Sequence, residues 1–408
     1  MEMRVLYITH AGFDTPGPNN QMAEVMFNDF LNRGYSLDVI QSHTKGINPD
    51  VPESLSGKDN FTCNTIVRKQ INKSHFIKRY IGDVIYYFRT MKYWLTKGPY
   101  DIIFVQSGPT VVFLLLLLKL FKFRTPILYS IYDVFPGHAY DIGVIKSRFL
   151  YNALRWLQKP CYKIPKVITV LSEDMKDIVV REGASPMHTY VVPAWFDVTT
   201  TREIAIEENR FIQKYNIDTT KFYVQFAGTI GYVFNYKTVL EVAQRLIHEK
   251  DIIFQMVGDG TTKESFVKEA TNLGLTNIQF YPLQPVEIVP DVYSACDVCL
   301  IPLMKGVIGN GVPSKLPILM ACRRLTITAV ESWSQYMQMI NDNYMGLTAD
   351  VLDYDALAAA ILYVRDNPQI ASEMVENAYH FGKENFSSVK SLQILADIFT
   401  TYSHATNR

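Results

Sequence analysis

The residues best suited to chemistry lie in a short loop that follows a predicted strand ending at Pro302. The loop reads GNGVPSK over residues 309–315 and enters a predicted helix near 316–322. Glycine and proline keep such a loop open, Ser314 is of a type that caps helices, and Lys315 lies where exposed amides already favour an anion. This pattern predicts a metal-free site for a leaving diphosphate. The alternative is a serine cap beside a solvated lysine.

Two glycine-rich turns follow predicted strands further upstream. One carries Gly228 and Gly231, and the other is Gly258, Asp259 and Gly260 in succession. Ligands of doubly wound sheets bind beyond the carboxyl ends of the strands, and glycine lets a diphosphate approach the backbone closely. Both turns are therefore candidate parts of the same site, although Gly-Asp-Gly is also common in ordinary turns.

Polar loops in the first half of the chain carry a second group of candidates. A loop with Gly17, Asn19 and Asn20 follows the first predicted strand and leads into a helix, so its N–H groups could approach an anion or a sugar. Asp133 and His138 follow another strand, where a carboxylate could bind hydroxyl groups or accept a proton and a histidine titrates in the useful range. The alternatives are ordinary turn residues, a helix N-cap for Asp133 and a surface histidine. The first loop lacks GxGxxG, which argues against a dehydrogenase.

These loops need a scaffold, and the hydrophobic pattern predicts one. Short apolar runs alternate with amphipathic segments, which is typical of βαβ units and parallel sheets. The series occurs twice, so we expect two doubly wound α/β domains over 1–197 and 198–385, joined by a polar segment near 197–221 with a helix around 207–215. The predicted strands are Val5–Thr9, Leu37–Gln41, Ile102–Gln106, Ile127–Ile131, Val167–Leu171, Tyr190–Pro193, Tyr223–Ala227, Ile252–Val257, Ile278–Tyr281, Val298–Pro302 and Leu325–Val330.

The composition of the 408-residue chain is that of a globular protein with more than one domain. Hydrophobic residues make up 48% and charged residues 20%, which is too apolar for a disordered chain. The five cysteines are odd in number and scattered, and the first residues predict a strand and no secretory signal, so we expect a reducing cytoplasm. Cys296 and Cys299 form a CxxC without a second ligand pair, in a predicted buried strand. We therefore predict no metal site and no cofactor.

Charge is distributed unevenly along the chain. Residues 1–197 carry 23 Lys and Arg against 17 Asp and Glu, and the remainder carries 17 against 23. Over residues 76–97 aromatic and cationic side chains interleave, which predicts contact with an anionic membrane surface. The alternative is a solvated helix with its aromatics packed inward. The apolar run 111–118 is too short to span a bilayer and is predicted as a buried helix, whose basic and aromatic end could touch lipid. No recognisable nucleic-acid module is present.

The motifs, taken in order, resemble one family. They are VLSE at 170–173, VVPAWFD at 191–197, FAGTIG at 226–231, VGDG at 257–260 and VPSK at 312–315. As an ordered set they resemble the retaining glycosyltransferases with the GT-B fold, family 4. They look most like the bacterial branch that builds O-antigen, capsule and exopolysaccharide. The resemblance runs over nearly the whole chain.

This resemblance implies two Rossmann-like domains facing across a cleft, with a C-terminal helix over 386–408 packing back on the first. It also implies a nucleotide-sugar donor, most often a UDP-sugar in this branch, held mainly by the second domain. The catalytic candidates are Asp133, His138 and Lys315, and acceptor contacts would come from the loop with Gly17, Asn19 and Asn20. The donor would contact Gly228, Gly231, Gly258, Asp259, Gly260, Leu283, Asn310, Gly311, Ser314 and Lys315.

Several positions depart from the family's pattern. Members typically have an Arg and a Lys after the first glycine strand of the second domain, two glutamates around the nucleotide helix, a glycine at the end of that helix, and a glutamate near the donor. The corresponding residues here are Thr229 and Asn235, Asn310 and Ile318, Arg323 and Arg324, and Gln335. These departures indicate unusual or weakened ribose recognition.

The expected function is retaining, metal-independent transfer of a sugar, with the hexose type expected, from a nucleotide-diphosphate donor to a lipid-linked saccharide. The reaction would serve surface polysaccharide synthesis, with the protein peripherally bound at the inner face of the cell membrane. One alternative is a non-catalytic or regulatory subunit with a decayed donor site, as Ile318 and Gln335 suggest. The other is a nucleotide-sugar 2-epimerase of the same fold, which the basic-aromatic stretch disfavours.

Overall fold

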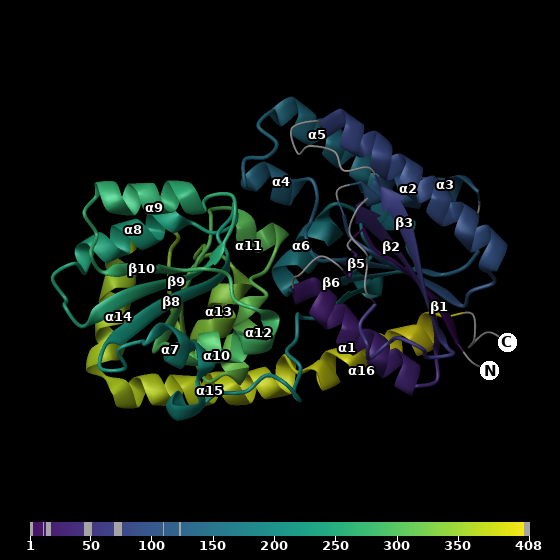
Figure 1. The fold of residues 1–408 in the computed structure, drawn as a ribbon. Helices are drawn as coiled ribbons and strands as arrows, with labels where there is room; N and C mark the ends of the chain where they lie inside the picture. Colours follow the sequence, from purple (N-terminus) through teal and green to yellow (C-terminus); the bar gives the residue numbers. More distant parts are fainter. Residues whose placement is uncertain are drawn as a thin grey trace. The chain divides into compact units, whose positions relative to one another are not determined.

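The computed structural model describes residues 3–10, 12–13, 18–44, 51–68, 76–108, 110–121 and 124–403. Contacts divide the chain into two compact units (Figure 1). Unit 1 comprises residues 1–137, 146–194 and 388–408, and unit 2 comprises residues 138–145 and 195–387. Residues 138–145, which we expected in the first domain, therefore group with the second.

Unit 1 is built on a parallel sheet in the order β3-β2-β1-β4-β5-β6-β7, which is seven strands within the described residues. The order reverses between β1 and β4, as in a doubly wound sheet. The strands are β1 (Arg4–Ile8), β2 (Ser36–Thr44), β3 (Phe61–Arg68), β4 (Ile102–Gln106), β5 (Ile127–Ile131), β6 (Val167–Val170) and β7 (Thr189–Val191). The helices are α1 (Pro18–Asn32), α2 (Phe76–Lys97), α3 (Val111–Leu120), α5 (Arg148–Gln158), η1 (Lys159–Lys163), α6 (Glu173–Arg181), η2 (Pro186–His188) and α16 (Ser388–Tyr402).

Unit 2 repeats this plan with the parallel order β10-β9-β8-β11-β12-β13, six strands among the described residues, and reverses between β8 and β11. The strands are β8 (Phe222–Thr229), β9 (Ile252–Asp259), β10 (Ile278–Tyr281), β11 (Val298–Pro302), β12 (Leu325–Ala329) and β13 (Leu347–Ala349). The helices are α4 (Gly137–Asp141), η3 (Ile206–Glu208), α7 (Arg210–Tyr215), α8 (Tyr236–Arg245), α9 (Lys263–Asn272), η4 (Val286–Ile288), α10 (Val289–Ser294), α11 (Val307–Asn310), α12 (Lys315–Ala321), α13 (Gln335–Asp342), α14 (Tyr354–Asp366) and α15 (Pro368–Asn385).

The predicted α/β class with two parallel sheets is confirmed. Central strands such as β5 and β11 are buried over their whole length, which explains why they read as continuous apolar runs. The strands predicted from the sequence do not include β3 and β13, which lie at the edges of the two sheets. In β3 polar residues interrupt the apolar ones, and β13 has only three residues, so neither forms an apolar run.

The last helix, α16, completes the core of unit 1. It packs against α1, and the ring of Phe399 is fully buried. The Phe399 centroid lies 4.9 Å from that of Phe30 and 6.2 Å from that of Phe104 in β4. Such ring contacts add to the burial of apolar area, so α16 is part of the unit 1 fold.

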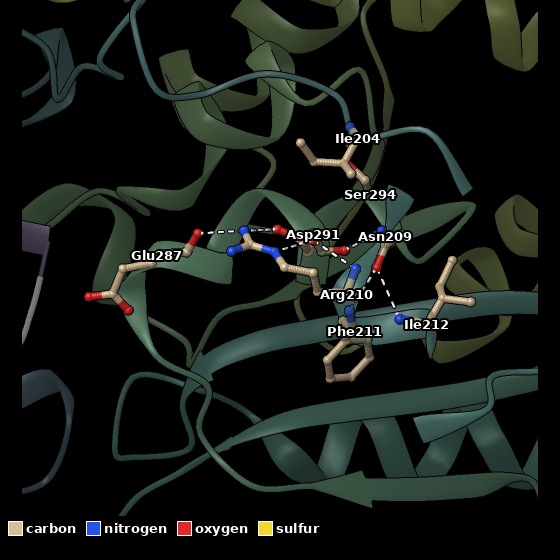
Figure 2. Close-up of polar contacts among 8 residues, drawn as sticks. All are labelled: Ile204, Asn209, Arg210, Phe211, Ile212, Glu287, Asp291 and Ser294. Atoms are coloured by element: carbon tan, nitrogen blue, oxygen red, sulfur yellow. Dashed lines mark hydrogen bonds and ion pairs between the residues drawn. The ribbon is translucent and has the colours of Figure 1, made fainter. Parts of the chain in front are cut away.

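An ion pair between exposed Arg210 and buried Asp291 fixes α10 to α7 in unit 2. Figure 2 shows Asn209 accepting hydrogen bonds from the first N–H groups of α7 and donating to the carbonyl of Asp291 at 2.8 Å. Arg210 binds the Asp291 carboxylate with Nε at 3.0 Å and a terminal nitrogen at 2.5 Å. Burial raises the pKa of Asp291, but the hydrogen bonds and charge of Arg210 outweigh burial and lower it. This network holds α10, which leads directly into β11 and the GNGVPSK loop.

The glycine turns at the ends of β8 and β9 pass close to each other. Gly228 is paired in register with Gly258, and an ideal Cβ on Gly258 would lie 1.9 Å from the carbonyl oxygen of Gly228. A Cβ on Gly260 would lie 2.3 Å from the carbonyl oxygen of Ile230. Gly258 and Gly260 have φ angles of +151° and +157°, which side chains rarely permit. Both glycines are therefore required for the close packing of backbone on backbone.

We predict that Gly258→Ala lowers the free energy of unfolding of unit 2 by about 3 kcal/mol or more, because a backbone carbonyl must move. Gly274→Ala is the matched control: its φ is +66°, but no atom lies within 4 Å of the position that its Cβ would take. It should cost only about 1 kcal/mol. Urea unfolding followed by circular dichroism measures both, and equal losses would contradict the steric explanation.

Candidate functional site

The side chain of Lys315, the first residue of α12, lies against the end of β8. An ideal Cβ on Gly228 would lie 2.8 Å from Lys315 Cε and 3.0 Å from Nζ, so a side chain at 228 would displace the lysine. Nζ also lies 4.5 Å from the centroid of the Phe226 ring, within the range of a cation–π contact. Gly228 thus makes room for the ammonium group, and Phe226 supports it.

The ammonium group of Lys315 is a cation without a counter-charge among the described residues. The residue is partly buried, and among the described residues no carboxylate forms an ion pair with it. Burial lowers the pKa of Lys315 to about 8. A desolvated cation without a protein partner attracts an anion strongly, because little water screens it. Lys315 is therefore less solvated than the alternative assumed.

The remainder of the predicted loop differs from expectation in one respect. Ser314 occupies the N-cap position of α12, but its side chain makes no capping hydrogen bond. The predicted serine cap is therefore wrong, since the residue adopts a helical backbone conformation, which directs the hydroxyl away from the first N–H groups. α12 also has only seven residues, so the lysine contributes more positive charge here than the helix end.

A polar cluster lies beside the same loop. Asn310 Nδ2 donates to Asp141 Oδ2 at 2.5 Å, and the N–H of Gly306 donates to Glu331 Oε1. Glu331 is only 5% exposed, and its Oε2 has no hydrogen-bond partner among the described residues. Burial raises the pKa of Asp141; Asn310 and His138 act to lower it, and Glu331 to raise it further. We call these residues the Asp141 cluster; it offers several carboxylate acceptors for hydroxyl groups.

Sequence reasoning missed the two carboxylates of this cluster. Glu331 follows β12 closely, so the rule that ligands bind beyond strand ends could have found it. Asp141 ends the short helix α4, and no local sequence signal connects it with Asn310, which is 169 residues away. His138, predicted as catalytic, lies in the same helix and acts electrostatically on Asp141.

Other predicted residues are placed as follows. Gly231 has no steric need for glycine beyond a 3.3 Å approach to Thr229. Asp259 is exposed and accepts a hydrogen bond from the N–H of Gly260 at 2.8 Å. Leu283 is exposed after β10, and Gly311 is buried with its N–H bonded to the carbonyl of Val307 at 2.9 Å. None of these contacts involves Lys315.

The candidates of the first domain belong to unit 1, except His138. Asn20 Nδ2 donates to the carbonyl of Gly12 at 2.7 Å, which closes the loop before α1. Asp133 is exposed just after β5. Gly17 and the side chain of Asn19 lie outside the described residues.

Two family profiles match the chain in tandem. The family described as Glycosyltransferase Family 4 matches residues 26–200, and the family described as Glycosyl transferases group 1 matches residues 207–381. The chain belongs to the GT-B glycosyltransferases of family 4. The resemblance stated from the motifs is confirmed, and the two reversing sheets are the fold of this family.

Relatives and solved structures agree with this membership. The chain is 26% identical over 262 residues to the probable glycosyltransferase WbjE of Pseudomonas aeruginosa, covering 63% of this chain and 64% of WbjE. It is 25% identical over 224 residues to the putative colanic acid biosynthesis glycosyl transferase WcaI of Escherichia coli K12, covering 53% and 54%. The matches thus span between about half and two thirds of these relatives. The structure of Anabaena HepE in complex with UDP and glucose has a TM-score of 0.73 at 14% identity, over 98% of this chain and 100% of HepE.

The departures of this family 4 member have structural counterparts. Arg323 stands where a glycine is expected and adopts the left-handed conformation that glycine favours, with a φ of +54°. Its guanidinium pairs with Glu376 and lies 3.9 Å from the ring centroid of Tyr379. Ile318 packs against the core of unit 2, and Gln335 is exposed at the start of α13. The contacts of Arg323 with Glu376 and Tyr379 explain how the chain forms the end of α12 without a glycine.

The cysteine pair has an ordinary structural environment. Cys296 and Cys299 are buried with their sulfur atoms 3.5 Å apart, and burial raises the pKa of the Cys296 thiol. A thiol that stays protonated is a poor nucleophile and a poor metal ligand. Within the described part of the chain, no group of three or more potential metal ligands is found.

The helix predicted to contact a membrane spans residues 76–97 as expected, but its aromatic residues are mostly in the core. Tyr86, Tyr87 and Trp94 are buried, and Phe88 is exposed. The side chains of residues 76–81 lie outside those described. Over the described residues, no helix is long and apolar enough to cross a bilayer.

We predict that Lys315→Met raises the free energy of unfolding at pH 7 by about 1–3 kcal/mol, because it replaces a desolvated cation with an apolar side chain of similar length. The folded pKa, about 8, is below the unfolded value of 10.5. The folded chain therefore holds this proton less tightly than the unfolded chain does. The stability that Lys315→Met gains over the parent is complete below pH 8 and is lost as pH rises toward 10.5.

Urea unfolding at pH 7 and pH 10 measures this difference. Lys268→Met is the control, because Lys268 is exposed on α9 and should change stability by less than about 0.5 kcal/mol. If Lys315→Met were less stable than the parent at pH 7, the desolvated lysine would not be destabilising the folded protein, and the prediction would be contradicted.

Proposed function

We propose that this protein is a retaining, metal-independent glycosyltransferase that moves a sugar from a UDP-sugar to a lipid-linked saccharide in surface polysaccharide synthesis. Glycosyl transfer is the chemistry of its family. The single observation that supports donor binding here is the ammonium of Lys315 at the end of β8, which forms no ion pair with any described residue. The end of β8 borders the switch point of the unit 2 sheet, where doubly wound folds bind nucleotides.

Support for a UDP-sugar comes from HepE, which was solved in complex with UDP and glucose and shares this fold. Support for a role in surface polysaccharides comes from WcaI, which is named for colanic acid biosynthesis. In this proposal the diphosphate lies beside Lys315 and the amides that follow Gly228. The base and ribose lie toward Gly258–Gly260 and Leu283.

The chemistry follows from where charge develops. When the bond between the sugar and the diphosphate breaks, negative charge grows on the leaving oxygen, and Lys315 stabilises it in a poorly solvated position. The sugar acquires oxocarbenium character, and the acceptor hydroxyl attacks on the face that the diphosphate leaves. Asp141 and Glu331 bind sugar hydroxyls through their carboxylates, with Asn310 fixing the position of Asp141. Asp133 and His138 serve the acceptor.

Support for a membrane-held acceptor comes from the excess of basic residues in the first half of the chain. Unit 1 carries the basic helix α2, and a lipid-linked acceptor requires the enzyme to work at a membrane surface. Residues 76–97 would lie toward the anionic inner face of the cell membrane. In that position the enzyme would reach the saccharide without extracting its lipid from the bilayer.

We predict that Lys315→Ala reduces kcat/KM for the native UDP-sugar about 100- to 1000-fold, the usual effect of removing one group that stabilises transition-state charge. Donor consumption with a lipid-linked acceptor fraction measures the rate, and Lys268→Ala is the matched control. Near-normal turnover of Lys315→Ala would remove the lysine from this role. Calorimetry with UDP and GDP separates the non-catalytic alternative that Ile318 and Gln335 favour, because a decayed site binds neither nucleotide.

We also predict that the affinity for UDP falls about tenfold between pH 7 and pH 9. With a pKa of about 8, Lys315 is mostly charged at pH 7 and mostly neutral at pH 9, and only the charged form attracts the diphosphate. Binding above pH 8 should also take up a proton, which calorimetry in buffers of different ionisation enthalpy detects. Lys315→Met should bind more weakly at pH 7 and lose this extra pH dependence; an unchanged pH profile would contradict the assignment.

A further inference from the structure

Helix α5 of unit 1 exposes an apolar stripe that the proposed reaction does not use. Phe149 is 84% exposed and Trp156 is 75% exposed. They are seven residues apart, so they lie on one side of the helix about 10 Å apart along its axis. Asn152 and Ala153, which lie between them on this side, are also exposed. Two large aromatic side chains therefore project into solvent from one ridge.

The helix that presents them is firmly attached to unit 1. Ser147 caps its start by accepting a hydrogen bond from the N–H of Leu150 at 3.3 Å. Arg155 Nε donates to Glu182 Oε1 at 2.7 Å, and Leu157 packs against the core of unit 1. The opposite side of α5 is thus the core-facing one, and the exposure of Phe149 and Trp156 is not a result of fraying.

The same segment is rich in cations that have no protein partner. Between Asp141 and Glu173 the chain contains six basic residues and no acidic one. Arg155 is paired with Glu182, and the other five are exposed, with side chains that form no ion pair or hydrogen bond with any described residue. These five are Lys146, Arg148, Lys159, Lys163 and Lys166.

Other helices of unit 1 also carry exposed apolar residues. The core of unit 1 includes residues of α2, α3 and η1, which continues from α5. In Figure 1 α2, α3 and α5 lie on the side of unit 1 away from α1 and α16. Phe88 and Leu95 of α2 and Leu120 and Phe121 at the end of α3 are exposed as well. Exposed apolar residues on this side of unit 1 (Figure 1) are thus not confined to α5.

We infer that unit 1 docks on an anionic lipid bilayer through α5. Phe149 and Trp156 enter the boundary between headgroups and acyl chains, where aromatic rings are favoured, and the five cations bind the lipid phosphates. A second copy of this chain is disfavoured as the partner, because two such surfaces would bring two sets of unpaired positive charges together. A protein partner is also disfavoured, since lysine is depleted at protein interfaces.

This inference moves the main membrane contact from residues 76–97 to α5. On α2 the described aromatic residues are mostly in the core, whereas both aromatic residues of the α5 stripe are free to insert. It does not depend on the reaction proposed above, because docking requires neither donor nor acceptor. Its failure would leave the role of Lys315 untouched.

The test is co-sedimentation of the full chain with vesicles of phosphatidylcholine containing about 30% phosphatidylglycerol, beside vesicles of phosphatidylcholine alone. The parent protein should bind the anionic vesicles more tightly, and more weakly at high salt. Phe149→Ala/Trp156→Ala should weaken binding about tenfold or more. Lys159→Glu/Lys163→Glu should remove the preference for anionic lipid. Val389→Ala is the control, because Val389 is 66% exposed on α16 and lies outside this surface.

Tryptophan fluorescence gives an independent readout. Of the four tryptophans, Trp156 and Trp333 are exposed. Anionic vesicles should shift the emission to shorter wavelength in the parent and in Trp333→Phe, and not in Trp156→Phe. Equal binding of the double alanine variant and the parent, or a shift that persists in Trp156→Phe, would overturn the inference. So would sedimentation velocity showing that the parent is a dimer which the alanine variant dissociates, with no vesicle binding by either.

Discussion

The main constraint on unit 2 is that a partly buried lysine ammonium, Lys315, forms no ion pair with any described carboxylate. Buried cations are normally paired, because desolvation is costly. Here the face of Phe226 offsets part of the cost, and Gly228 leaves the space that the ammonium occupies. The strand that carries both residues must also pass the turn of β9 at backbone contact, which requires Gly258 and Gly260. Several positions that look like independent motifs therefore serve one electrostatic arrangement.

Unit 2 also separates its charged groups by role. The cation lies at the end of β8, while one oxygen of each carboxylate in the Asp141 cluster accepts a hydrogen bond, from Asn310 or from the N–H of Gly306. If either carboxylate paired with Lys315, the lysine would lose its attraction for an anion. A sugar diphosphate has negative charge at one end and hydroxyl groups at the other, so a site of this kind matches both ends. Folding stability and ligand attraction are in conflict at residue 315.

Much of this could be predicted from the sequence, and the failures have physical causes. Buried strands such as β5 and β11 were found with the bounds that the structure has, because parallel strands covered on both faces read as apolar runs. The edge strand β3 was missed because polar residues interrupt it. Lys315 could be found because it lies in a loop after a strand, whereas Asp141 reaches Asn310 only through tertiary folding. Exposure is also difficult to predict from sequence. For the aromatic residues of α2 both membrane contact and inward packing were open, and the described ones are mostly in the core. The exposed aromatic residues of α5 were not predicted.

The position of α16 has a consequence for biosynthesis. Unit 1 consists of segments separated in the chain, and its last segment, residues 388–408, follows the whole of unit 2. Until α16 leaves the ribosome, Phe30 and Phe104 lack the ring of Phe399 that covers them. Unit 2 can therefore fold first although it is translated second, which reverses the usual order for consecutive domains. An N-terminal fragment ending before residue 195 would carry this uncovered apolar patch and tend to aggregate.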